Sequence, residues 1–385
     1  MRGRGAVLVV GGAKRPYAIS RPLEVVDIEL DPPGPTEVLV RIRAAGLCHS
    51  DLSVIDGTRP RPLPMLLGHE AAGIVVACGP DVHGLSPGDH VITTFVPACR
   101  SCEPCLSDRP ALCEPGNASN VAGTLLSGER RIHSDDRVIN HHVGISAFAE
   151  YAVISARSLI KVPEDLPFDI AAAFGCAVIT GVGAVINAAK VAPGMSVAVV
   201  GLGGVGMAAV MGAHAVGAQS IIAIDVNTEK LSMAKAFGAT EVFHASHPDV
   251  VGMVREATQG GVNAALEMAG SVAALNIAWA ITRRGGITVT SGLPAADARA
   301  SYSPAQLVGE ERVLRGSYLG SGDPARDVPK YITWYEQGRL PVNRLISSHI
   351  SLDDINSGLD LLASASGLRH VVAFGTQDRP AASIL

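Results

Sequence analysis

Four cysteines gather in one short stretch of the chain. Cys99, Cys102, Cys105 and Cys113 follow the spacing Cys-x2-Cys-x2-Cys-x7-Cys, so four thiols lie within fifteen residues. Four thiolates at this spacing can reach one tetrahedral ion, and a shell made only of thiolates leaves no position for a substrate. We therefore predict a structural zinc site here. Unmetallated thiols and an iron–sulfur cluster are the alternatives that the cysteine count leaves open.

A second set of metal ligands is dispersed along the chain. Cys48 precedes His49 and Ser50, His69 lies between Gly68 and Glu70, and Cys176 follows Gly175. Two thiolates and one imidazole with an open fourth position form a catalytic zinc shell, which here the fold must assemble. Each residue alone is more often a core residue than a ligand. Their joint presence predicts the site.

The cysteine usage indicates a reducing compartment. The chain has seven cysteines, an odd number, and all but Cys78 belong to the two groups above. Disulfides pair cysteines evenly and are typical of small secreted domains. We expect reduced thiols in a cytoplasmic enzyme, with Cys78 as a buried small residue.

A glycine-rich motif points to a dinucleotide. It follows a β-branched strand at once, precedes a helical stretch, and is followed by an acid at the end of the next strand. The glycines allow a tight turn and let a pyrophosphate approach the helix N-terminus. Asp225 would accept hydrogen bonds from the adenosine ribose and repel a 2′-phosphate, so we predict NAD rather than NADP. A turn without a ligand is the alternative. The motif comprises Gly201, Gly203, Gly204, Val205 and Gly206.

The composition and patterning predict two domains. The 385 residues exceed one ordinary core, and 42 glycines with only 4% aromatic residues suit a close-packed α/β protein. Short strands separated by Pro and Gly (38–43, 71–76, 91–94 and 148–153) indicate an irregular β-rich domain, with Met1 to Val10 as a first strand rather than a signal peptide. Residues 114–146 are polar and weakly patterned, and we expect a long loop beside the four-cysteine lobe.

From residue 178 strands and helices alternate, which predicts a doubly wound parallel sheet. Cys176 would lie just before the first helix of this domain, so its metal would face the nicotinamide. Expected domains are 1–177 (with the lobe at 97–114), 178–321, and 322–385 returning to the first. We expect helices at 179–187, 207–216, 228–237, 250–258, 273–281, 324–336 and 352–363, and strands at 196–200, 220–224, 241–243, 264–267, 287–290 and 369–374.

Charge and hydropathy exclude two classes of partner. The net charge is −5 and no run of Lys or Arg occurs, which argues against nucleic-acid binding. No apolar stretch reaches the roughly 18 residues that a membrane span needs.

Together these motifs resemble those of the zinc-containing medium-chain alcohol dehydrogenases over essentially the whole chain. The resemblance rests on residues 46–51, 68–70, 99–113, 175–176, 201–206 and 224–227. It implies a GroES-like catalytic domain, a Rossmann-type domain, NAD and two zinc ions per chain. The stretch at 114–146 resembles that of the long-loop members, which are typically dimers, so we expect a homodimer.

The resemblance also assigns roles to residues around the two sites. Asp51 would orient His69, Glu70 would approach the metal, and Ser50 would begin proton removal from the alcohol. Zinc would lower the pKa of that alcohol, and its carbon would give a hydride to the nicotinamide. The residues implied at the cofactor are His49, Asp225, Asn227, Lys230 and Arg369.

The chain departs from the family pattern in two places. Ser53 stands where many members have a histidine that completes the proton path. At the expected substrate mouth, Arg59 replaces an apolar or acidic residue, which suggests a substrate with a carboxylate or other polar tail; a surface arginine pointing to water is the alternative. Lining candidates are Arg59, Phe95, His142, Leu293 and Tyr318.

The predicted function is hydride transfer between NAD and a small primary or aromatic alcohol or its aldehyde. A thiol-dependent formaldehyde dehydrogenase is one alternative, although Arg59 in place of an acid argues against its glutathione form. A non-catalytic nucleotide-binding or zinc-sensing protein is the other, and the intact ligand set with Ser50 argues against it.

Overall fold

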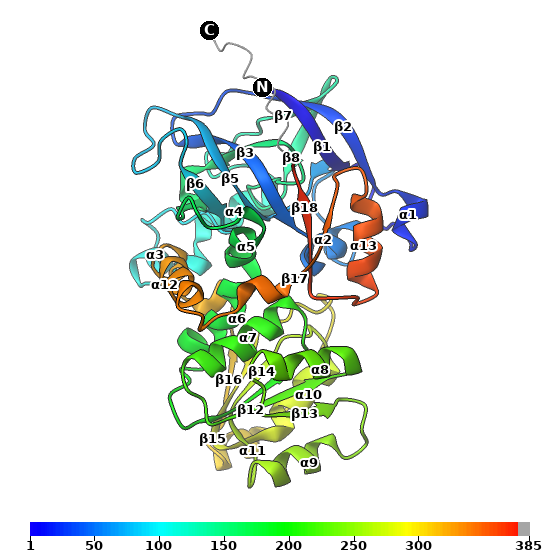
Figure 1. The fold of residues 1–385 in the computed structure, drawn as a ribbon, viewed down its shortest axis with the longest axis vertical. Coiled ribbons are helices and arrows are strands. Elements are labelled where there is room, and N and C mark those ends of the chain that lie inside the picture. The colour runs from blue at the N-terminus through cyan, green and yellow to red at the C-terminus, as the bar shows by residue number, and fades with distance from the viewer. Residues whose placement is uncertain (376–385) are drawn as a thin grey trace.

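Strands from the first half of the chain form a closed barrel and, together with two strands from its C-terminal part, a mixed sheet. The computed structural model describes residues 1–375 and places both sheets at one end of the molecule (Figure 1). The barrel runs β1 (Arg2–Leu8), β2 (Leu23–Leu30), β7 (Ile132–Ser134), β8 (Arg137–His141), β4 (Met65–Leu66). The sheet runs β10 (Leu159–Lys161), β6 (His90–Thr93), β5 (Glu70–Cys78), β3 (Glu37–Gly46), β18 (Arg369–Ala373), β17 (Ile346–Ile350), with β9 (Tyr151–Ser155) also paired with β3.

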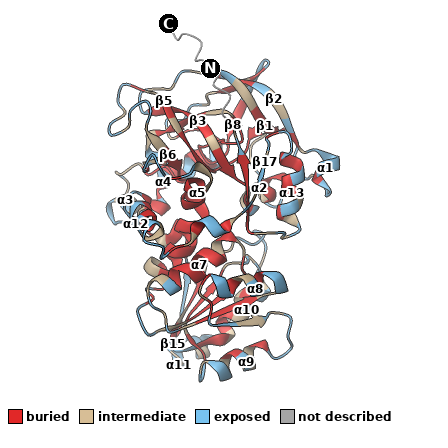
Figure 2. Ribbon diagram, in the orientation of Figure 1, coloured by how far each residue is buried: buried red, intermediate tan, exposed pale blue. Residues whose placement is uncertain are grey.

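The second half of the chain forms the predicted doubly wound sheet, in which all six strands are parallel. Its Val/Ile/Ala-rich central strands are buried on both faces, as a sheet covered by helices requires. Figure 2 shows these strands and α7 as buried. The order is β13 (Glu241–His244), β12 (Ser220–Asp225), β11 (Ser196–Val200), β14 (Val262–Glu267), β15 (Thr282–Thr290), β16 (Val313–Gly316).

Helices connect the strands and cover the sheets. The predicted helix at 324–336 is confirmed as α12, whereas the short strands β16 and β17 were missed. The helices are α1 (Tyr17–Ser20), α2 (His49–Ile55), α3 (Glu103–Leu106), α4 (Glu114–Ala122), α5 (Phe168–Ala173), α6 (Ile179–Gly183), α7 (Gly204–Ala215), α8 (Thr228–Ala236), α9 (Val250–Ala257), α10 (Val272–Ile281), α11 (Pro304–Gly309), α12 (Pro324–Glu336) and α13 (Ile355–Ala363).

The C-terminal segment returns to the first domain. β18 pairs antiparallel with β3, and α13 packs near α2 (Figure 1). The last ten residues of the expected return, 376–385, lie outside the described residues.

The prediction of a long loop at 114–146 was wrong. Cys113 caps α4 by accepting a hydrogen bond from the Gly116 N–H, and Gly123 ends the helix in the left-handed region at φ +69°. β7 and β8 then form a hairpin whose two-residue turn contains Asp135 at φ +51°. The hairpin is stable because it closes the barrel through β2 and β4, which are distant in sequence.

A single helical run from residue 168 to 188 joins the two domains. It comprises α5, a π-helical turn at Phe174–Val178, α6 and a second π-helical turn at Ala184–Ala188. By length and composition it could cross a membrane, contrary to expectation, but 78% of its most apolar window is buried inside the protein. One apolar cluster continues from β11 through this run to β6, as a core helix requires.

Candidate functional site

Three elements bring the dispersed ligands together. Cys48 is the N-cap of α2, and its backbone N–H donates to Asp51 Oδ2 at 3.0 Å. His69 immediately precedes β5. Gly68 beside it has φ +92°, and a Cβ there would lie 2.5 Å from the backbone nitrogen of Phe148, so only glycine fits. Cys176 lies in the π-helical turn of the domain-joining run, not before a helix as predicted. Such turns are frequent at functional sites because they redirect side chains.

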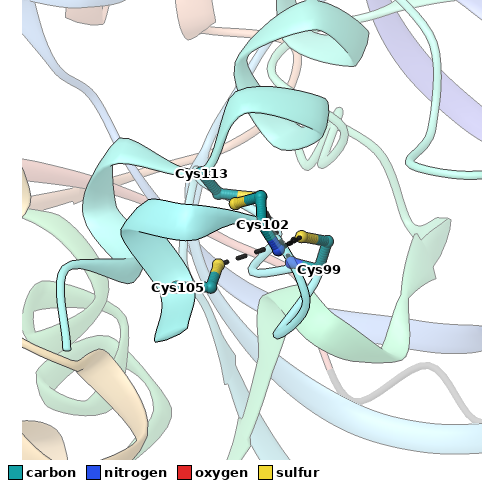
Figure 3. A group of neighbouring side chains, drawn as sticks. All are labelled: Cys99, Cys102, Cys105 and Cys113. Atoms are coloured by element: carbon teal, nitrogen blue, oxygen red, sulfur yellow. Dashed lines mark hydrogen bonds between the residues drawn. The ribbon is translucent and has the colours of Figure 1, made fainter. Parts of the chain in front are cut away.

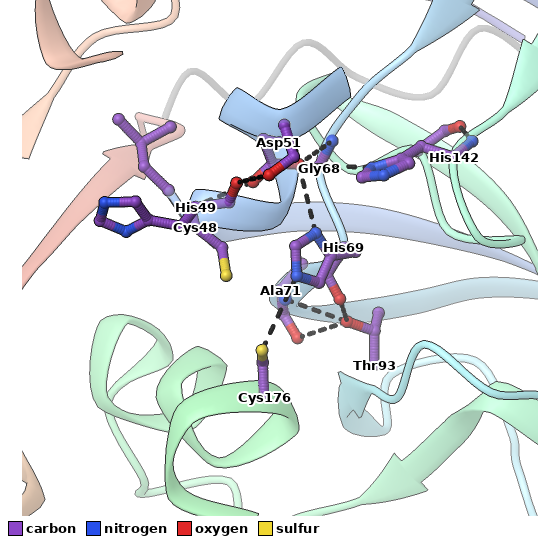
Figure 4. Close-up of polar contacts among 12 residues, drawn as sticks. Cys48, His49, Asp51, Gly68, His69, Ala71, Thr93, His142 and Cys176 are labelled. Atoms are coloured by element: carbon purple, nitrogen blue, oxygen red, sulfur yellow. Dashed lines mark hydrogen bonds and ion pairs between the residues drawn. The ribbon is translucent and has the colours of Figure 1, made fainter. Parts of the chain in front are cut away.

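The geometry of the three ligands fits one zinc ion. Their ligand atoms all lie within 4.8 Å of one another, and all three side chains are buried. Cys176 Sγ lies 3.7 Å from His69 Nε2. Tetrahedral zinc separates a thiolate and an imidazole nitrogen by about 3.5 Å, so little movement is needed. Figure 4 shows the Cys48 and Cys176 sulfurs and the His69 ring turned toward the same space.

Asp51 holds the imidazole from behind. Its Oδ1 lies 3.2 Å from His69 Nδ1 and 3.3 Å from His142 Nδ1, and the Gly68 N–H donates to the same oxygen at 3.4 Å. Burial alone would raise the pKa of Asp51, but the two histidines lower it to about 2. The anion fixes the tautomer in which His69 Nε2 is free to bind a metal. The structure thus places Asp51 where the resemblance implied.

An acid and an arginine lie on the other side of the ligands. Glu70 Oε1 is 3.5 Å from Arg369 Nε, and Arg369 Nη1 donates to the Leu47 carbonyl at 3.0 Å. Burial raises the pKa of Glu70 to about 7 despite the arginine. Hydrogen bonding from Cys176, together with His69 and Arg369, lowers the pKa of Cys48, which favours a metal-binding thiolate.

The four-cysteine lobe also fits a single ion (Figure 3). Its sulfurs lie within 4.8 Å of one another, with Cys99 Sγ–Cys105 Sγ at 3.9 Å and Cys102 Sγ–Cys113 Sγ at 4.0 Å. Tetrahedral zinc would place them about 3.8 Å apart, and an iron–sulfur cluster would need a wider cage. The distances are twice a disulfide bond of about 2.05 Å, and every described cysteine is free. Backbone N–H groups of Cys99, Cys102 and Gly116 donate to the sulfurs.

The glycine-rich loop joins β11 to α7 at the carboxyl edge of the sheet, where such folds bind ligands. A Cβ on Gly206 would lie 1.9 Å from the Gly201 carbonyl oxygen, whereas a Cβ on Gly203 would meet nothing within 4 Å. The turn is therefore tightly packed where Gly206 meets the Gly201 carbonyl, whereas free space remains beside Gly203. A Cβ on Gly204 would lie 2.6 Å from Arg369 Nε, so this arginine lies between the loop and the zinc ligands.

The other expected cofactor residues have differing environments. Asp225 ends β12 and accepts hydrogen bonds from the Leu202 and Asn227 N–H groups at 2.6 and 2.8 Å. Asn227 Oδ1 caps α8, so this side chain is already engaged. Burial lowers the pKa of Lys230, partly offset by Asp225. His49 is exposed and points away from the Cys48 sulfur in Figure 4.

A cavity of about 110 Å³ adjoins the zinc ligands. All five residues expected at the substrate site line it: Arg59, Phe95, His142, Leu293 and Tyr318. The Phe95 and Tyr318 rings meet edge to face at 5.6 Å, and His142 lies edge to face against His69 at 5.3 Å. Ser50 also lines the cavity, as does Val205 of the glycine-rich loop, so the three candidate metal ligands, the Ser50 hydroxyl and this loop share one space.

Sequence reasoning missed several cavity residues: Arg61, Val143, Thr180, Ser291, Ser317 and Leu319. The sequence does point to Arg61, because residues two apart in an extended segment face the same side and Arg59 is a predicted lining residue. A second cavity of about 380 Å³ adjoins the first and shares Ser291, Leu293, Ser317 and Tyr318 with it; Arg109 and Leu112 of the lobe also line it.

The chain matches known families over both domains. Residues 34–164 match the alcohol dehydrogenase GroES-like domain, and residues 204–337 match the zinc-binding dehydrogenase domain. The chain is 38% identical to an S-(hydroxymethyl)glutathione dehydrogenase of Paracoccus denitrificans and 37% identical to a class-3 alcohol dehydrogenase of Cereibacter sphaeroides; both alignments cover 97% of this chain and 100% of the relative.

Solved structures also superpose on nearly the whole chain. An alcohol dehydrogenase zinc-binding domain protein from Burkholderia ambifaria superposes with a TM-score of 0.92 at 35% identity, covering 97% of this chain and 99% of that chain. Benzyl alcohol dehydrogenase from Acinetobacter calcoaceticus superposes with a TM-score of 0.90 at 33% identity, covering 97% and 100%.

Proposed function

The chain belongs to the zinc-containing medium-chain alcohol dehydrogenase family, and from this premise we propose that it transfers a hydride between NAD and a small primary or aromatic alcohol or its aldehyde. One observation carries the proposal: Cys48, His69 and Cys176 converge at a cavity that Ser50 and the cofactor loop also line. A nucleotide-binding sensor would need neither an open coordination position on the metal nor the Ser50 hydroxyl beside it.

Zinc bound by these three residues supplies a Lewis acid that lowers the pKa of an alcohol. The chain's own groups do the rest. Ser50 accepts the hydroxyl proton of the substrate and passes it outward. The Ser53 hydroxyl donates to the His49 carbonyl at 3.0 Å and has no basic nitrogen, so it cannot end the proton path as a histidine would, and water takes the proton from Ser50. Phe95, Leu293 and Tyr318 give the substrate an apolar wall beside the carbon that gives the hydride.

NAD is the proposed cofactor because Asp225 stands where a 2′-phosphate would lie. A carboxylate repels that phosphate, and no arginine follows Asp225 in residues 226–229. The four-cysteine lobe supports a second, structural zinc, since its shell has no open position.

A cytoplasmic homodimer is the proposed assembly. The parallel sheet ends at β16, whose residues Val313 to Gly316 are all exposed. Such an open strand edge is a template for pairing with a second copy. Light scattering tests this proposal, because a monomeric mass at micromolar concentration would contradict it.

A thiol-dependent formaldehyde dehydrogenase is a second candidate. The S-(hydroxymethyl)glutathione dehydrogenase of Paracoccus favours it by its name and full-length similarity. A glutathione adduct is a tripeptide and would have to occupy the outer cavity of about 380 Å³ as well as the inner one. The benzyl alcohol dehydrogenase similarity and the small aromatic-lined inner cavity favour a one-ring alcohol.

One assay separates these candidates. Reduced nicotinamide absorbance is followed with benzyl alcohol, aliphatic alcohols and formaldehyde, with NAD and NADP, with and without glutathione. We expect turnover of benzyl alcohol with NAD. Activity with formaldehyde only in the presence of glutathione would favour the second candidate. NAD binding without turnover of any substrate would overturn catalysis.

A further inference from the structure

The inner cavity carries two arginines that the reaction does not use. Arg59 and Arg61 both line it, while the zinc ligands line its other part and Phe95 and Tyr318 form an aromatic wall. The chemistry of hydride transfer requires the ligands, Ser50 and the cofactor loop. It gives no reason for two guanidinium groups.

Arg61 is held in place but incompletely paired. Its Nη1 donates to the Asn120 carbonyl at 3.2 Å, which fixes the side chain. Its Nε is sealed from water and has no hydrogen-bond partner. Burial, and then the charge of Arg59, lowers the pKa of Arg61. Because Nε is inaccessible, a ligand in the cavity would have to pair with the terminal Nη atoms of Arg61. An anionic ligand there would offset part of the free-energy cost of holding the guanidinium away from water beside a second positive charge.

No acid neutralises the pair. Within residues 1–375, neither Arg59 nor Arg61 forms an ion pair with a carboxylate, and the neighbouring charge that lowers the pKa of Arg61 is that of Arg59. Two like charges beside one cavity attract an anion.

The backbone makes this arrangement rigid. The segment reads Arg59-Pro60-Arg61-Pro62-Leu63-Pro64. Each proline fixes its own φ and keeps the preceding residue extended. The Arg59 N–H donates to the Ser53 carbonyl at 2.7 Å, which ties the segment to the end of α2. Little conformational entropy is then lost when the two side chains bind a ligand.

We propose that Arg59 and Arg61 bind a carboxylate at the end of the substrate remote from its alcohol or aldehyde group, so that the enzyme acts on a small carboxylated, one-ring alcohol. The planar guanidinium fork matches a planar carboxylate. The ring of the substrate would lie against Phe95 and Tyr318. Its reacting carbon would lie beside Cys48, His69 and Cys176, which we call the Cys48 group. This inference rests on the proposed function.

The test compares three substrates that differ at one group. These are benzyl alcohol, 4-(hydroxymethyl)benzoate and the neutral isostere 4-(hydroxymethyl)benzamide, oxidised with NAD by wild type, Arg59→Leu, Arg61→Leu and the double variant. Arg137→Leu is the matched control, because Arg137 is an exposed arginine at the hairpin of β8. We expect wild type to prefer the benzoate over the amide.

Each cavity variant should lower kcat/KM for the benzoate by about 10- to 100-fold, as loss of a charge-assisted hydrogen bond does. The loss should fall on KM, because a contact remote from the reacting carbon binds substrate and transition state equally. Activity with benzyl alcohol and the amide should stay within about twofold, which also reports that the loop held by Arg61 is intact. Arg137→Leu should leave the benzoate preference unchanged.

Several results would overturn the inference. Equal losses on the benzoate and the amide would do so, as would a wild type indifferent to the carboxylate. A preference for 4-(hydroxymethyl)phenyl phosphate would overturn the assignment of a carboxylate. If no alcohol is oxidised at all, the proposed function fails separately. Calorimetric binding of 4-(hydroxymethyl)benzoate then decides the inference, since a dissociation constant unaffected in the double variant would remove it.

Discussion

His141 should make the barrel sensitive to acid. Its side chain is fully buried on β8, where Nε2 accepts a hydrogen bond from the Arg131 N–H at 3.1 Å and Nδ1 has no partner. Burial, with Arg130 and Arg131 nearby, lowers the pKa of His141 from 6.5 to about 3. The imidazole is therefore neutral in the folded protein at every pH above about 3.

The sign of the effect follows from the two pKa values. Above the unfolded value of 6.5 both states are neutral and the histidine contributes nothing. As the pH falls below 6.5, the unfolded chain binds a proton that the folded chain rejects, so stability is lost until the pH reaches about 3. The loss is about 2 kcal/mol at pH 5 and approaches about 5 kcal/mol below the folded pKa.

The assay is the free energy of unfolding by urea, measured between about pH 7.5 and 5 for wild type and His141→Gln. Glutamine keeps an oxygen that can accept the Arg131 N–H but has no titrating group. All other groups titrate in both proteins, so the difference isolates His141. We expect the free-energy difference between the two proteins to change by about 2 kcal/mol over this range in favour of the variant. A difference that stays constant with pH would refute the reasoning, and His83→Gln, at an exposed histidine, serves as the control.

The zinc and cofactor sites yield four more predictions. Asp51→Asn should weaken zinc binding by the Cys48 group by about 10- to 100-fold in chelator competition, because one amide oxygen cannot serve both the Cys48 N–H and the His69 ring; unchanged affinity would contradict this role. Ser50→Ala should lower kcat by about 100- to 10,000-fold near neutral pH and by less in alkali, where hydroxide can take the proton. A loss independent of pH would remove Ser50 from proton transfer. Asp225→Ser should raise the ratio of kcat/KM with NADP to that with NAD by about tenfold or more, and an unmoved ratio would show that specificity lies elsewhere. Metal analysis of Cys105→Ser should find about one zinc ion per chain instead of two, whereas full retention would place the second ion outside the lobe.

Local signals in the sequence were enough for the nucleotide domain and for the four-cysteine lobe. The Gly201–Gly206 turn and the alternation of buried strands with helices are short-range patterns, and the parallel sheet follows from them. The spacing of the four cysteines is equally local, so the lobe could be predicted without knowing its surroundings.

Features that depend on distant contacts could not be predicted in this way. The polar stretch that contains β7 and β8 has little intrinsic preference, and it becomes a hairpin because β2 and β4 accept it. Cys176 was expected just before a helix, whereas packing in the core keeps the helix continuous through a π-helical turn that contains it. The spacing from Arg59 could point to Arg61, but only the fold shows that its Nε is buried without a hydrogen-bond partner.

The chain positions of the two metal groups impose an order on biosynthesis. The lobe is complete once Cys113 has left the ribosome, so its ion can be captured while most of the chain is still unmade. The other group also needs Cys176, and the Arg369 side chain beside it is made much later, on β18, which pairs with β3. A nascent chain arrested before Cys176 would hold one metal and lack the other. The metal content of arrested chains would therefore record how far synthesis had gone.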